Sequence, residues 1–115
     1  MTILSEITLV YICNVQDLQP ERGQAALVNG HQVAIFRLFD DTVVAVDQFD
    51  PYSEANVMSR GIVGTRGGVP TIASPIYKHI FSLETGEVLE TNGADPLNLK
   101  VWPIQVIDDE IYVEG

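Results

Sequence analysis

The feature that most constrains the fold of this chain is a series of short apolar runs, rich in β-branched and aromatic residues, that turn residues separate. Runs of this length and composition are typical of β-strands, so the pattern predicts an all-β fold. Asn29 and Gly30 lie between the runs 25–28 and 32–38. This dipeptide predicts a tight hairpin, because both of its residues tolerate a positive φ.

The same alternation of runs and turns continues along the chain. The predicted strands are residues 9–13, 25–28, 32–38, 42–46, 71–73, 80–83, 88–90, 101–106 and 111–113. Gly86 offers the left-handed position for a second hairpin, between 80–83 and 88–90. Within 101–106, the alternate residues Trp102, Ile104 and Val106 share one face, which we expect to be buried.

Helical signals are few. Residues 15–18 suit one helical turn, and residues 53–58 suit another, with Ser53 as its N-cap. The glycine-rich stretch 61–68 predicts a long loop or a loose hairpin. It lacks both the Gly-x-Gly-x-x-Gly pattern and the Gly-Lys-Ser/Thr ending of nucleotide-binding loops.

Length and charge limit the partners that the chain can have. Its 115 residues fit one domain, residues 1–115. The net charge of −10, from 16 acidic and 6 basic residues, repels phosphate groups, so we expect no nucleic acid and no anionic membrane as a partner. A basic leader and an apolar run of about 18 residues are both absent from the sequence, which predicts a cytoplasmic protein without a membrane span.

Side chains that could carry chemistry are scarce. Cys13 is the single cysteine and lies in the apolar run 9–13, so we expect a buried, inert thiol. His31 stands beside the Asn-Gly turn and is expected to be solvated, while His79 precedes a strand, and neither belongs to a triad signature. The sequence therefore predicts no catalytic, cofactor-binding or metal-binding residue.

Two segments resemble the two loops of Rieske iron–sulfur domains. Residues 45–52, followed by 58–61, are similar to the first loop, which reads Cys-Pro-His in that family. Residues 73–87 are similar to the second loop, which reads Cys-Pro-x-His and leads into a Phe-x-x-x-Thr-Gly-Glu hairpin. The resemblance covers most of the chain and implies a fold of three antiparallel sheets, with the two loops forming one tip.

This chain matches the spacing and prolines of the two Rieske loops, but it lacks the residues that bind the cluster. Asp50 and Ser74 stand where the family has cysteine, and Tyr52 and Tyr77 stand where it has histidine. Carboxylate, hydroxyl and phenol oxygens are hard ligands and do not replace soft thiolates on an iron–sulfur cluster. We therefore expect a Rieske-like fold without the cluster, in which these four side chains seal the vacated site through hydrogen bonds and aromatic packing.

One cluster-free branch of the superfamily is similar over several short segments: the small subunits of assimilatory NAD(P)H-dependent nitrite reductases. These segments are residues 33–37, 50–51, 59–61 and 73–75. The resemblance implies a non-catalytic chain, free of cofactors, beside a large subunit with FAD, siroheme and a [4Fe-4S] cluster that reduces nitrite to ammonia in nitrate assimilation. The hypothesis for docking that subunit is a tip that presents Phe49, Pro51, Tyr52, Arg60, Pro75, Ile76 and Tyr77.

Two other functions stay open from the sequence alone. One is a stand-alone, cluster-free interaction module of another oxidoreductase or of a regulatory assembly. The other is an electron-transfer ferredoxin with unusual ligands.

Overall fold

The computed structural model describes residues 8–115, and its regular secondary structure consists of β-strands and two short 3₁₀ turns. Within these residues three antiparallel sheets and one short ribbon form, as the resemblance implies. The first sheet has the order β1 (Leu9–Asn14), β13 (Glu110–Glu114) and β12 (Ile104–Ile107). The second has the order β11 (Val101–Trp102), β4 (Val43–Asp47), β3 (His31–Arg37) and β2 (Gly23–Val28).

The third sheet and the ribbon carry the two loops of interest. The sheet has the order β10 (Val88–Glu90), β9 (Ile80–Ser82), β8 (Val69–Ala73) and β7 (Ile62–Arg66). The ribbon pairs β5 (Phe49–Asp50) with β6 (Ala55–Asn56), and two 3₁₀ turns complete the elements, η1 (Val15–Asp17) and η2 (Met58–Arg60). No helix within residues 8–115 has the length and apolar character needed to cross a membrane.

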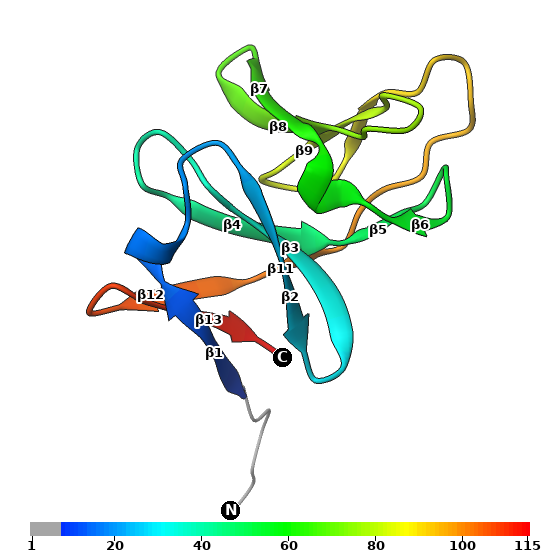
Figure 1. Ribbon diagram of the computed structural model, residues 1–115. Coiled ribbons are helices and arrows are strands. Elements are labelled where there is room, and N and C mark those ends of the chain that lie inside the picture. Colours follow the sequence, from blue (N-terminus) through cyan, green and yellow to red (C-terminus); the bar gives the residue numbers. More distant parts are fainter. Residues whose placement is uncertain (1–7) are drawn as a thin grey trace, which may run out of the picture.

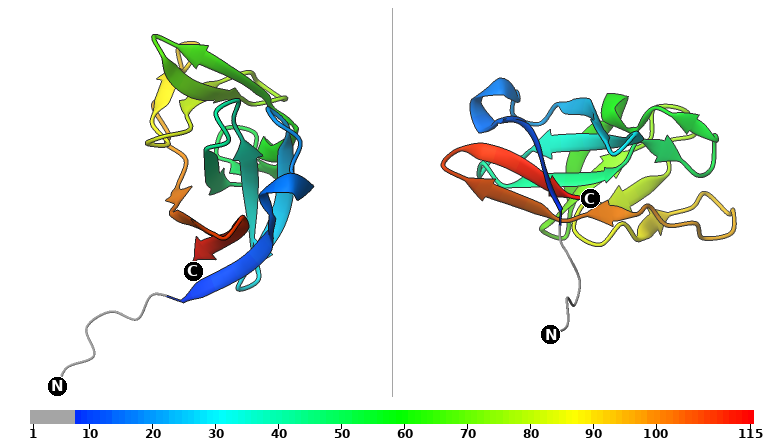
Figure 2. Two further views of the ribbon diagram at one scale, coloured as in Figure 1. Left: turned by 90° about the vertical axis from the view of Figure 1, so that its left-hand side faces the viewer. Right: turned by 90° about the horizontal axis from the view of Figure 1, so that it is seen from below.

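The second sheet lies between the other two, and both of its faces are buried (Figures 1 and 2). Alternate residues of β3 point to opposite faces, so Val33 and Ile35 pack toward β13, whereas Ala34 and Phe36 pack toward β8 and β9. A strand buried on both faces reads as one continuous apolar run. This is the physical reason for the unbroken apolar sequence between Val33 and Phe36.

The predicted turns form as their residues require. Asn29 and Gly30 join β2 to β3 with φ values of 52° and 81°, and Gly86 has a φ of 78° between β9 and β10. The glycine-rich stretch proves to be a hairpin, in which Gly67 and Gly68 take φ values of 59° and 83° between β7 and β8. The left-handed conformation at these turns explains why glycine or asparagine is needed there.

Two local predictions were wrong. Residues 101–106 do not form one strand, since Pro103 lacks an N–H and separates β11, which pairs with β4, from β12, which pairs with β13. The alternation therefore does not continue through the segment, and Val106 is 46% exposed although Trp102 is buried. Ser53 caps no helix either, because its hydroxyl donates to Asp50 and the helical turn begins only at Met58.

Candidate functional site

The two loops of the Rieske resemblance meet at one end of the molecule. The first follows β5, and the second runs from residue 74 to residue 79 between β8 and β9. They are joined by a buried hydrogen bond in which the Ser74 hydroxyl donates to the Asp50 carboxylate. The two positions that hold thiolates in the family are thus bonded directly to each other.

The carboxylate of Asp50 is the centre of this junction. It also accepts hydrogen bonds from the Ser53 hydroxyl at 2.9 Å and from the Tyr52 backbone N–H at 2.9 Å. Burial alone raises the pKa of Asp50, but the hydrogen bonds from Ser74, Tyr52 and Ser53 outweigh it and hold the pKa below its ordinary value. Asp50 is therefore ionised near neutral pH, and its hydrogen bonds are charge-assisted.

Tyr52, at the first histidine position, makes its contacts with other residues of the same chain. Its ring stacks on the His79 ring, with the ring centres 3.7 Å apart and the planes at 10°. Its hydroxyl donates to the Asp95 carbonyl oxygen at 2.7 Å and accepts from the Leu97 N–H at 2.9 Å. The phenol therefore joins the first loop to the second and to the segment that leads into β11.

Tyr77, at the second histidine position, points outward and is 57% exposed. Its ring is nearly perpendicular to the His79 ring, at 87°, with the ring centres 6.2 Å apart. His79 itself is only 6% exposed, and its Nδ1 atom has no hydrogen-bond partner among the described residues. Sequence reasoning missed the place of His79 in this aromatic group, and it also missed the segment 92–97.

The residues predicted to dock a partner are spread over several elements of the structure. Pro75, Ile76 and Tyr77 lie on the second loop, with Ile76 and Tyr77 exposed. Pro51 and Tyr52 are half-buried on the first loop. The remaining two lie elsewhere: Phe49 lines a separate pocket of about 340 Å³ with His31 and Asn56, and Arg60 is exposed on η2, which packs against β2.

The residues at the four ligand positions do not fit an iron–sulfur cluster. A Rieske cluster takes two thiolates on one iron and two imidazoles on the other, whereas these positions supply four side chains whose polar atoms are all oxygens. Three of the side chains, Asp50, Ser74 and Tyr52, already use their oxygen atoms in hydrogen bonds within the tip. Across residues 8–115, no group of three His, Cys, Asp or Glu side chains is arranged to hold a metal ion.

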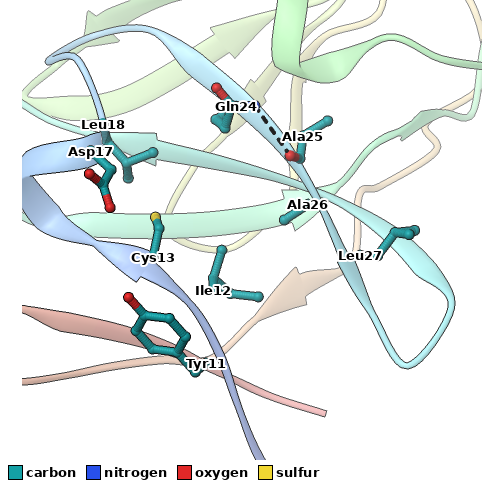
Figure 3. Close-up of a pocket in the computed structure, with 9 residues that line it drawn as sticks. All are labelled: Tyr11, Ile12, Cys13, Asp17, Leu18, Gln24, Ala25, Ala26 and Leu27. Carbon is teal, nitrogen blue, oxygen red and sulfur yellow. Dashed lines mark hydrogen bonds between the residues drawn. The ribbon is translucent and has the colours of Figure 1, made fainter.

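Cys13 lies far from the tip, in a pocket of about 460 Å³ between β1 and β2 (Figure 3). The thiol is half-buried rather than buried as predicted. Partial burial and the nearby Asp17 carboxylate raise the pKa of Cys13, so the thiol stays protonated at neutral pH. This supports the prediction of an inert side chain.

The sequence predicts a solvated His31, and its side chain is indeed 53% exposed, but it also contacts a carboxylate. Its Nε2 atom lies 3.1 Å from the Asp47 carboxylate, which also accepts a hydrogen bond from the Trp102 indole at 2.8 Å. These contacts fasten the β2–β3 turn to β4 and β11. These structural contacts account for the position of His31, so no catalytic role is needed to explain it.

Comparison with known proteins gives the family. The family model described as "Rieske-like [2Fe-2S] domain" matches residues 8–114. A nitrite reductase (NADH) small subunit of Salmonella typhimurium is 36% identical over 105 residues, which are 90% of this chain and 94% of that protein. A nitrite reductase [NAD(P)H] large subunit of Klebsiella oxytoca is 36% identical over 102 residues, and this match covers 89% of the chain but only 10% of that much longer protein.

A solved structure agrees with these relatives. The crystal structure of a candidate NADH-dependent nitrite reductase small subunit from Mycobacterium tuberculosis superposes with a TM-score of 0.88 at 41% identity, covering 96% of this chain and 97% of that one. The fold and the sequence thus indicate the same family. The chain belongs to the Rieske-like [2Fe-2S] domain family and, within it, to the small subunits of nitrite reductase.

Proposed function

We propose that this chain is the non-catalytic small subunit of an NAD(P)H-dependent nitrite reductase that converts nitrite to ammonia in nitrate assimilation. Its partner is a large subunit that carries FAD, siroheme and a [4Fe-4S] cluster, and both act in the cytoplasm. The two kinds of relative support this pairing, because similar domains occur as a separate small subunit and as a tenth of a large subunit.

The observation that carries the proposal is the bond between Ser74 and Asp50. In a Rieske domain these two positions hold iron, and the iron both carries the electron and joins the loops. Here the loops are joined by hydrogen bonds, while the donor set for the electron carrier is missing. A domain that keeps the fold in this way contributes shape and contact to an assembly.

The tip is the surface we assign to the large subunit. Ile76 and Tyr77 are its exposed members on the second loop, with Pro75 beside them and Pro51 and Tyr52 behind. Exposed aromatic and aliphatic side chains on a rigid loop are typical of the centre of a protein interface. Phe49 and Arg60, which lie on other surfaces, are proposed as its margin.

Co-expression with the large subunit from the same host tests the pairing. We expect an affinity-tagged chain to retain the large subunit, and nitrite-dependent oxidation of NADH or NADPH to require the large subunit and to rise when the chain is present. The chain alone should be inactive and colourless. Failure to retain the large subunit, together with unchanged activity, would refute the pairing, and stoichiometric iron and sulfide in the isolated chain would refute the cluster-free role.

A pair of matched variants tests the surface. Ile76→Ser combined with Tyr77→Ser removes the exposed apolar side chains and leaves the buried junction intact, so we expect the complex to dissociate at least about tenfold more readily. Leu27→Ser removes an even more exposed apolar side chain from β2, in another part of the molecule, and should leave binding unchanged. If the tip variant binds the large subunit as tightly as the Leu27→Ser control, the interface does not lie at the tip.

A further inference from the structure

A third segment belongs to the tip, although it carries none of the family's ligand positions. Residues 91–100 connect β10 to β11 without forming a strand, and residues 92–98 are all exposed. Asn92 and Gly93 take positive φ values of 53° and 89°, which turn the chain back. Figures 1 and 2 show this loop at the same end of the molecule as β5 and β6.

The segment is fixed at its base and at its middle by different groups. At the base, the Leu99 N–H donates to the Gly86 carbonyl oxygen at 2.8 Å, and the Asn98 side chain accepts from the Val88 N–H at 3.0 Å. At the middle, the Tyr52 hydroxyl bonds to Asp95 and Leu97, as described above. A phenol can donate one hydrogen bond and accept another, and here it does both with backbone groups 43 and 45 residues away.

These bonds hold the backbone of Leu97 against Tyr52, whose ring stacks on His79 of the second loop. Leu97 is 43% exposed, and Ile76 is 47% exposed. Tyr52 reaches Tyr77 through the His79 ring that lies between them, and the Asn92 side chain donates to the Tyr77 carbonyl oxygen at 3.3 Å. Leu97 is thus held at a fixed place relative to the exposed members of the tip.

We propose that Tyr52 is a positioning residue: by binding Asp95 and Leu97 through its hydroxyl, it holds Leu97 in the surface that meets the large subunit. This inference rests on the proposed function. It changes the role of Tyr52 from a contact to the support of a contact, and it adds Leu97 to the interface.

The low charge of this surface argues for an apolar partner surface. The chain carries a net charge of −10, yet the only Lys, Arg, Asp or Glu in the second loop, residues 74–79, is Lys78, and the only one in residues 91–97 is Asp95. A basic partner would be attracted to the acidic remainder of the surface rather than to this patch. An apolar surface on the large subunit is the partner that the patch fits, since similar domains exist within one polypeptide with a large subunit.

Positioning matters because the segment pairs with no strand among residues 8–115 that would order it. A loop that is free before binding loses conformational entropy when it binds, at about 1 kcal/mol or more for each residue that becomes ordered. The hydrogen bonds from Tyr52 order Leu97 in advance. Their removal should therefore weaken binding even though the hydroxyl itself bonds only to backbone groups of this chain in the structure described.

The test measures the affinity of purified variants for the large subunit. Tyr52→Phe keeps the ring that stacks on His79 and removes only the hydroxyl, and Leu97→Ser removes only the exposed contact. We expect each change to raise the Kd about tenfold. Because both act through Leu97, the double variant should be little weaker than either single variant, and Phe39→Ser at the β3–β4 turn, 83% exposed, should bind as the wild type does.

Hydrogen exchange supplies a readout that does not need the partner. The Leu97 amide should exchange at least about tenfold faster in Tyr52→Phe, because it has lost its acceptor, while the amides of β8 and β9 keep their rates. Wild-type affinity in both single variants, or additive losses in the double variant, would overturn the inference. If the wild-type chain does not bind the large subunit, the proposed function and this inference both fail, although faster exchange would still establish that Tyr52 orders the loop.

Discussion

The hydrogen bond between Ser74 and Asp50 should be the main stabilising link of the tip, and its strength can be estimated from its setting. Hydrogen bonds to a charged group contribute about 1.5–3 kcal/mol, so Ser74→Ala should lower the free energy of unfolding by about that amount. Asp50→Ala also leaves the Tyr52 N–H and the Ser53 hydroxyl without their acceptor. We expect it to lower the free energy of unfolding by about 3–5 kcal/mol.

Urea unfolding of a double-mutant cycle measures the link itself. Trp102 is the single tryptophan and is buried, so its fluorescence reports unfolding in all four proteins. Residues in direct contact show interaction energies of about 0.5–3 kcal/mol, and the charged acceptor places this pair in the upper half of the range. Additive losses in Asp50→Ala and Ser74→Ala would refute the idea that this bond replaces the metal as the link between the loops.

The pH dependence provides an independent check with a definite sign. The pKa of Asp50 is lower in the folded chain than in the unfolded chain, where an aspartate has a pKa of about 3.9. Its contribution to stability is therefore fully present above the unfolded pKa and is lost as the pH falls through the folded pKa. The difference in stability between the wild type and Asp50→Asn should shrink as the pH is lowered below about 4, and a constant difference would contradict an ionised Asp50.

Three further substitutions test contacts that shape the site. Gly23→Ala should lower the free energy of unfolding by about 1–3 kcal/mol in urea titrations, because a Cβ atom would collide with the Ser59 carbonyl oxygen. Gln48→Ala should lower the thermal midpoint, with a loss of about 2–3 kcal/mol, since both amide atoms of the buried Gln48 bond to Ser59, at 2.8 Å and 2.7 Å. His79→Phe should keep the stack on Tyr52 and remove a buried nitrogen that has no hydrogen-bond partner among residues 8–115. Urea titration should therefore show stability within about 1 kcal/mol of the wild type. A larger loss would indicate that Nδ1 has a partner in solution.

Much of the fold could be predicted from the sequence because the signals that carry it are local. The Asn29-Gly30 turn and the left-handed Gly86 require particular residues at particular positions, and the structure confirms both. The family framework was also readable, since two short loops identify it. The break at Pro103 was missed because its consequence is not local: Trp102 pairs with Ala45, far back in the chain, and only that pairing assigns β11 to another sheet.

The arrangement of the tip was only partly predictable for the same physical reason. Alignment with the family places Asp50 beside Ser74, and the structure brings them together. Nothing in the sequence around Asp95 and Leu97 indicates that a phenol 43–45 residues earlier will hold that segment. The stack of Tyr52 on His79 was equally hidden, because the framework had assigned no role to the position of His79.

The exchange of ligands for oxygen side chains alters what the tip responds to. In a Rieske domain the link between the loops is the cluster, so the state of the link depends on iron and on electron transfer. Here the link is a carboxylate with three hydrogen-bond donors, from Ser74, Ser53 and Tyr52, and protonation is the change that weakens it. The shape of the tip is then independent of the redox state, which suits a domain that must present the same surface to a partner throughout the partner's catalytic cycle.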